Sequence, residues 1–76
     1  MVVVFNYGLG KVSGEFKDEY AAQSYIDYLF EWSQKTNQEF DRHFIIPVLE
    51  DENGKYFKFR EMKYVYNPTT EYFELG

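Results

Sequence analysis

Aromatic side chains take an unusually large share of this short sequence, with eight phenylalanines, eight tyrosines and one tryptophan among 76 residues. A chain of this length needs nearly all of its apolar surface to offset the entropy lost on folding. It also has no cysteine, so neither disulfides nor thiolate-bound zinc can help. Each ring buries roughly 150–250 Å², and so small a body cannot enclose all of them. We expect the surplus to form a binding surface or the interface of a homodimer.

Charge and hydropathy restrict the partners and the compartment. Thirteen acidic and eight basic side chains give a net charge of −5, which opposes binding to duplex DNA or to anionic lipid, because both need a field of Lys and Arg. No apolar run approaches the ~20 residues of a membrane span, and residues 1–5 lack the basic leader of a signal peptide. Together with the absence of cysteine, these features predict a soluble, cytoplasmic protein that binds no membrane and no duplex DNA.

The first half of the chain predicts a β-hairpin followed by a helix. Residues 2–7 are β-branched and aromatic, glycines interrupt them, and apolar and polar side chains then alternate over 12–16. From Asp18, a suitable N-cap, the apolar period becomes helical and ends near Asn37, so we expect one helix over 18–36. Its apolar stripe consists of Ala22, Tyr25, Ile26, Leu29 and Ser33, and is widened by Ala21, Tyr28, Phe30 and Trp32.

The second half of the chain predicts strands only. Residues 43–50 are almost continuously apolar, and Pro47 indicates an edge strand or a bulge, because proline donates no hydrogen bond to a sheet. The turn residues 51–54 lead into a long strand whose apolar side chains change sides near 60–61, as they would at a bulge. A turn containing proline precedes the last strand, 71–75.

The expected fold class is therefore α+β. We expect a single domain over residues 1–76 with the order ββαβββ. Its sheet should be mostly antiparallel, with four to five strands and the helix packed on one face, since this is the economical way to bury one helical stripe.

Residues suited to metal binding or catalysis are scarce. His43 is the only histidine, and without cysteine it has no partners for a zinc site, so we expect it to be an ordinary residue at the start of a strand. The serines lack a nucleophile motif, and the glycines lack the spacing of a dinucleotide-binding loop. Asp27 and Glu31 are neighbours on the helix, but on its solvent side, without the dry pocket that general-acid catalysis needs. We expect no enzyme, no metal and no cofactor.

One segment, residues 55–66, combines basic and aromatic side chains. Tyr56, Lys58 and Arg60 share one face of the expected strand, and Tyr64 follows them. Positive charge beside aromatic rings is typical of proteins that bind single-stranded nucleic acid, although the glycines of an RNA-recognition signature are missing here. These four residues are one candidate site. The competing interpretation is that they keep the outer face of a strand soluble.

Acidic side chains form the other candidate site. Asp27 and Glu31 lie on the outer side of the expected helix, and Glu50, Asp51 and Glu52 lie at a hairpin tip. Nothing in the expected fold requires these carboxylates, and side chains in such places readily reach a partner. As a set they would steer association with a basic protein surface, and the competing interpretation is solubility alone.

The leading functional interpretation is a non-enzymatic protein-binding or inhibitor module, of the kind encoded by phages and other mobile elements. An acidic protein of this kind would occupy the nucleic-acid-binding surface of a host protein by presenting phosphate-like charge. Binding of single-stranded nucleic acid through residues 55–66 is the alternative, and a small enzyme is the third interpretation. The expected partner is another protein with a basic surface.

Overall fold

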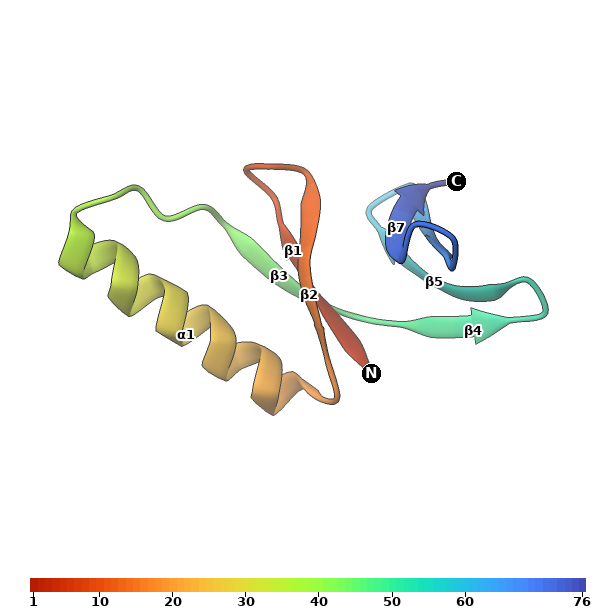
Figure 1. The fold of residues 1–76 in the computed structure, drawn as a ribbon, viewed down its shortest axis with the longest axis horizontal. Helices are drawn as coiled ribbons and strands as arrows, with labels where there is room; N and C mark the ends of the chain where they lie inside the picture. The colour runs from red at the N-terminus through yellow and green to blue at the C-terminus, as the bar shows by residue number, and fades with distance from the viewer. The chain divides into compact units, whose positions relative to one another are not determined.

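The structure, a computed structural model, describes residues 1–76 and contains one helix and seven strands (Figure 1). The strands form two antiparallel sheets, with the orders β2-β1-β3 and β4-β5-β6-β7, and the predicted α+β fold class is confirmed. In chain order the elements are β1 (Val2–Asn6), β2 (Lys11–Phe16), α1 (Glu19–Thr36), β3 (His43–Pro47), β4 (Leu49–Asp51), β5 (Gly54–Phe59), β6 (Met62–Asn67) and β7 (Tyr72–Leu75).

Backbone contacts divide the chain into two compact units, Met1–Ile45 and Ile46–Gly76. The first unit contains the helix and the β1–β2 hairpin, and the second contains the four-stranded sheet. The expected single domain over residues 1–76 remains a prediction.

The β1–β2 hairpin forms where the sequence predicts it. Val2 lies opposite Phe16, and the register shifts once midway along the pair. In the turn, the Asn6 Oδ1 atom accepts a hydrogen bond from the Leu9 N–H at 3.0 Å. Gly10 then takes a φ of 68°, a conformation that glycine adopts at little cost. All five residues of β1 are buried, as expected for the central strand of its sheet.

Helix α1 confirms the prediction for residues 18–36 and shows why the helix begins and ends there. The Asp18 Oδ1 atom accepts a hydrogen bond from the Ala21 N–H at 2.8 Å, which satisfies one of the free donors of the first turn. At the other end Asn37 takes a left-handed conformation with φ 55°, which ends many helices.

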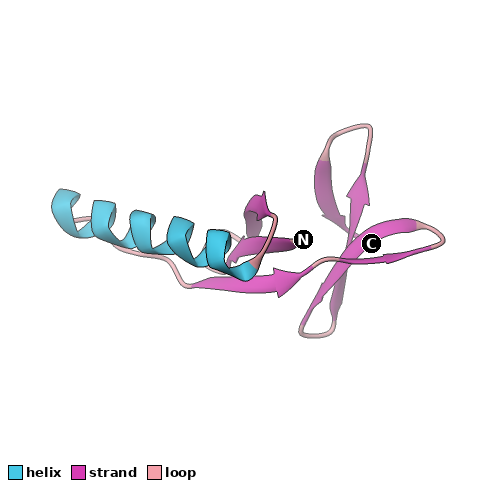
Figure 2. Cartoon of the chain, turned by 90° about the horizontal axis from the view of Figure 1, so that it is seen from below, coloured by secondary structure: helices cyan, strands magenta, loops and turns pink.

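One side of α1 packs on the three-stranded sheet of its own unit (Figure 2). Val2, Val4 and Ala22 form the buried centre of this contact. Ser33 is also buried, and its hydroxyl donates to the Phe30 carbonyl at 2.7 Å, so a polar residue is accommodated within the apolar stripe. Partly buried side chains complete the cluster, namely Phe16, Tyr25, Ile26 and Ile45.

The second unit is an antiparallel meander with one aromatic face. Phe57 is fully buried, and its ring stacks on that of Tyr64 at 4.9 Å with an interplanar angle of 9°. Phe73 lies 5.1 Å from Phe57 and 5.3 Å from Tyr66, between ring centroids. Offset and edge-on ring pairs of this kind add about 0.5–1.5 kcal/mol each beyond the burial of their area. Aromatic contacts thus hold together a unit of only 31 residues.

The order of strands departs from the predicted ββαβββ first at Pro47. The apolar segment 43–50 is two strands, because β3 ends at Pro47 and β4 begins at Leu49. β3 lies at an edge of its sheet, as predicted from the proline. Since Pro47 has no N–H, the ladder cannot continue through it, and the next residues pair in the other sheet instead.

The second departure lies at residues 60–61, where the sequence indicates a bulge and the structure has a turn. Phe59 pairs with Met62, so Arg60 and Glu61 connect two antiparallel strands. Arg60 takes a φ of 58°, which costs a non-glycine residue roughly 1–2 kcal/mol. The chain after the helix therefore forms five strands in place of three, and the strands belong to two sheets where one was expected.

Candidate functional site

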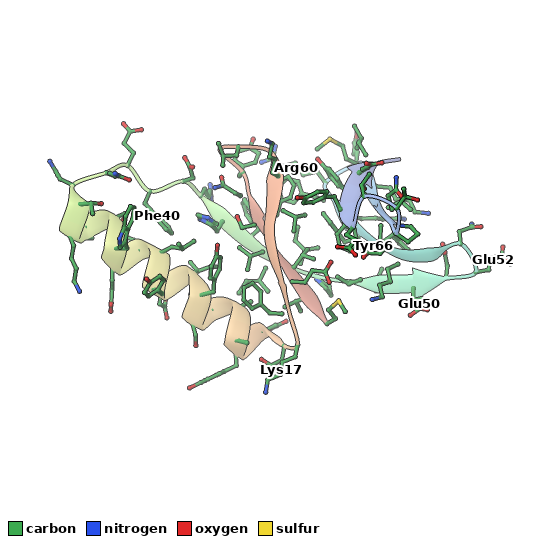
Figure 3. The ribbon with its side chains drawn as sticks, in the orientation of Figure 1. Lys17, Phe40, Glu50, Glu52, Arg60 and Tyr66 are labelled. Carbon is green, nitrogen blue, oxygen red and sulfur yellow. The ribbon has the colours of Figure 1, made fainter.

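The five acidic residues predicted to bind a partner fall into two groups. Asp27 and Glu31 lie on α1, whereas Glu50 and Asp51 lie in β4. Glu52 follows at the tip of the β4–β5 hairpin, as Figure 3 shows. All five side chains are exposed. Each group is thus accessible within its own unit.

Asp51 has a structural role that sequence reasoning missed. Its Oδ1 atom accepts a hydrogen bond from the Asn53 N–H at 2.8 Å, and its Oδ2 atom lies 3.7 Å from the Lys63 ammonium. The first contact stabilises the hairpin turn. The second joins β4 to β6, although a pair this exposed contributes only about 0–1 kcal/mol. The expectation that nothing in the fold requires these acids is therefore wrong for Asp51.

The outward side of α1 carries an acidic group with an aromatic ring beside it. Tyr20, Asp27 and Glu31 are spaced by seven and four residues, which places them on one helical face; we name them the outer row. Tyr20 is 83% exposed, the highest value among the exposed large apolar side chains. Asp27 accepts a hydrogen bond from the Gln23 amide at 3.0 Å, and neither carboxylate pairs with a basic side chain. Neither carboxylate of this face is therefore neutralised by a direct ion pair.

A second set of rings on α1 is also exposed, contrary to its place in the predicted apolar stripe. Tyr28 is 65% and Trp32 is 49% exposed. Phe30 is 48% exposed, and its ring meets that of Phe40 edge-on at 5.2 Å. The signal for this exposure was present in the sequence. A helix packed on one sheet buries a stripe only slightly wider than about 100°, and the apolar residues of α1 extend beyond such a stripe.

The four residues of the alternative site do not share one surface. Tyr56 and Lys58 lie on the same face of β5, as predicted, but Arg60 lies in the β5–β6 turn. Tyr64 lies directly across from Phe57, and cross-strand partners point to the same face. Because Phe57 follows Tyr56 on its strand, Tyr64 lies on the opposite face of the sheet from Tyr56.

The rings of this alternative site are already in contact with other side chains. The Lys63 ammonium lies 4.4 Å from the centroid of Tyr56, and Tyr64 is stacked on Phe57. Each of these tyrosines therefore has a ring face covered that a nucleic-acid base would otherwise stack on. Lys58, directly across from Lys63, is exposed, and two like charges in this position repel each other.

His43 has the structural surroundings expected for it. It is the first residue of β3, and its Nδ1 atom donates to the Asp41 carbonyl at 2.7 Å. Its ring lies against Phe40, with 4.9 Å between centroids. No group of three or more His, Cys, Asp or Glu side chains is arranged to hold a metal ion.

Two open depressions lie within the separate units. One, of about 470 Å³, is lined by Met1, Glu15, Phe16 and Lys17. The other, of about 290 Å³, is lined by residues of β6 and β7, by Pro68 in the turn between them and by Gly76. Neither lining includes a serine, a cysteine or a histidine.

The structure has no helix with the length and apolar character that crossing a bilayer requires. Comparison with known proteins gives no relative, since no family model, no curated protein and no solved structure matches the chain. Function must therefore be inferred from the surface chemistry of the chain itself.

Proposed function

We propose that the protein is a non-enzymatic binding module that docks on another protein with a basic surface. The observation that carries the proposal is the outer row of α1. There Asp27 and Glu31 are exposed and unpaired with bases, on the same helical face as Tyr20, whose ring is 83% exposed.

The two kinds of side chain have separate roles in binding. Tyrosine is enriched among the residues that dominate interface energies, because it buries a large area with few rotatable bonds. Carboxylates attract a basic surface over longer distances and fix its orientation. The two acids are four residues apart, about 6 Å along the helix axis. Their mutual repulsion is therefore relieved when a cation approaches both.

The mode of action that we propose is inhibition by occupancy. A partner whose basic surface normally binds nucleic acid loses access to it when the acidic face of α1 covers that surface. Such a role would suit a protein from a phage or another mobile element that acts on a host protein in the cytoplasm. The absence of cysteine, which suits a reducing compartment, supports this location.

Binding of single-stranded nucleic acid is less well supported by the geometry. Tyr56 and Tyr64 lie on opposite faces of the sheet, and both rings contact protein side chains. A fluorescent single-stranded oligonucleotide titrated with the protein tests this alternative directly. Tight, salt-dependent binding to the oligonucleotide would replace our proposal with the alternative.

The proposal is tested with the protein that co-purifies from the native host, by measuring its dissociation constant for two double variants. Asp27→Lys with Glu31→Lys reverses two charges on the outer row, and we expect binding at least about tenfold weaker, a loss of about 1.4 kcal/mol. Glu50→Lys with Glu52→Lys makes the same change in net charge on β4 and its hairpin turn, and is the matched control.

The outcomes separate three explanations. Weakening by the α1 variant alone supports the outer row as the binding surface. Equal weakening by both variants means that the outer row has no special role, because the acids of the hairpin contribute as much or because only the overall charge matters. Unchanged binding in the α1 variant contradicts the proposal.

A further inference from the structure

A regular row of side chains runs along one flank of α1. Its members are spaced alternately by three and four residues, the spacing at which side chains form the seam between two packed helices. The flank row consists of the N-cap residue Asp18, which precedes the first residue of α1, and of Ala21, Tyr25, Tyr28, Trp32 and Lys35 within the helix.

The flank row lies between the buried side of α1 and its outer row. Tyr25 is partly buried, and its ring packs against Phe16 of β2 at 5.0 Å, so the row follows the β2 side of the helix. Tyr28 and Trp32 are 65% and 49% exposed, and both end positions of the row are exposed. The unit therefore leaves this row partly uncovered.

We propose that a second copy of the chain covers the flank row, with the two α1 helices antiparallel. A two-fold axis would pass between Tyr25 and Tyr28. Each contact then occurs twice, since residue i of one copy meets residue j of the other and j meets i, as in any two-fold symmetric interface.

The antiparallel arrangement is complementary at every step of the row. Ala21 of one copy faces Trp32 of the other, so a small side chain lies opposite the largest one. Tyr25 faces Tyr28, which pairs two aromatic rings. Lys35 faces Asp18, whose Oδ1 atom holds the Ala21 N–H while Oδ2 remains available to the lysine. Size and charge therefore match along the whole length of the seam.

Other arrangements of the same surface lack this complementarity. In a parallel pair Trp32 would face Trp32, Asp18 would face Asp18 and Lys35 would face Lys35. Like charges would then repel each other at both ends of the row. The self-complementary pattern favours a second copy over an unrelated partner helix, which would have no reason to match it.

The expected dimer is weak. The row offers two well-exposed rings per copy, which places the contact below the size of a standard interface, about 1,200–2,000 Å² in total. The outer row lies on a different side of the helix and stays accessible in the dimer. This inference goes beyond the proposed function and does not rest on it, because either contact can form without the other.

Sedimentation equilibrium over a range of protein concentrations tests the dimer. The parent protein should show a concentration-dependent monomer–dimer equilibrium, and Tyr28→Glu should raise its dissociation constant at least about tenfold. Tyr20→Glu places the same substitution on the outer row of the same helix and should leave the equilibrium unchanged. Both residues are exposed, and circular dichroism confirms that each variant keeps its helix.

A second variant keeps the test decisive if Tyr28→Glu lowers the helix content. Lys35→Glu places a carboxylate opposite Asp18 and should also weaken the dimer. A parent protein that stays monomeric throughout overturns the proposal. Equal weakening by Tyr20→Glu and Tyr28→Glu also overturns it, since the flank row would then have no special role.

The orientation of the helices is tested by disulfide trapping, which is clean because the chain has no cysteine. Ala21→Cys and Trp32→Cys variants are mixed and oxidised, and the three disulfide-linked products are resolved by intact mass. The antiparallel dimer predicts an excess of the mixed product over its statistical share. Dominance of the two like-with-like products, or a statistical mixture, contradicts the antiparallel register.

Discussion

Replacement of Phe57 by alanine should remove most of the stability of the second unit. The Phe57 side chain has no exposed surface. Its ring centroid lies 4.9 Å from that of Tyr64 and 5.1 Å from that of Phe73. Truncation of a buried phenylalanine costs about 3–5 kcal/mol, and both ring pairs disappear with it. Since a chain this short has a net stability of only ~3–5 kcal/mol, the variant should be largely unfolded in that unit at room temperature.

Urea unfolding followed by circular dichroism, together with the dispersion of amide signals in an NMR spectrum, measures this loss. Tyr72→Ala is the matched control, because Tyr72 lies in the same sheet but is 72% exposed. It should change the free energy of unfolding by no more than about 0.5 kcal/mol. A cost below about 1 kcal/mol for Phe57→Ala would refute the inference that aromatic contacts hold this unit together.

Three further predictions concern the N-cap of α1, the β4–β5 hairpin and the effect of removing metal ions. Asp18→Ala should lower the free energy of unfolding by about 0.5–2 kcal/mol, because the Ala21 N–H loses its acceptor, and Asp18→Asn should restore most of it; urea unfolding measures both. Asp51→Asn should lower the free energy of unfolding by less than about 1 kcal/mol, since it loses the ion pair with Lys63 but keeps an oxygen for the Asn53 N–H. Asp51→Ala loses both contacts and should lower it further, and a larger loss for Asp51→Asn than for Asp51→Ala would contradict these roles. EDTA should leave the melting temperature unchanged, because no side-chain cluster suits a metal ion, and a drop of several degrees would mean that a site has been missed.

The helix and the first hairpin were predictable because their signals are local. Asp18 and Asn37 mark the ends of α1 through a side-chain acceptor and a left-handed backbone, and both properties belong to the residue types. The aromatic core of the second unit was partly predictable as well. Phe57 and Phe59 alternate with polar residues and are both buried.

The number of sheets was not predictable, because it depends on contacts between distant segments. The turn at Arg60 has no glycine or asparagine to mark it, so periodicity alone suggested a bulge. The break after Pro47 was visible, but nothing local indicated that β3 and β4 would pair in different sheets.

The candidate site was predicted in part. Asp27 and Glu31 are exposed on α1, as their spacing indicated. Tyr20 was missed, although an aromatic residue seven positions before Asp27 falls on the polar face of the helix and is a recognisable signal. The ion pair of Asp51 with Lys63 was missed because it joins two strands that are not adjacent in the sheet. The hydrogen bond from the Asn53 N–H to Asp51 is local, and turn chemistry could have predicted it.

The most direct test of the central claim is an NMR footprint of the co-purified partner on the isotopically labelled protein. Binding should shift or broaden the amide signals of the outer row, Tyr20, Asp27 and Glu31, more than those of any other surface. Raising the salt concentration should reduce these changes, because exposed charges are screened. Changes confined to residues 55–66, with the signals of α1 unaffected, would contradict the claim and identify the basic and aromatic strands as the binding surface.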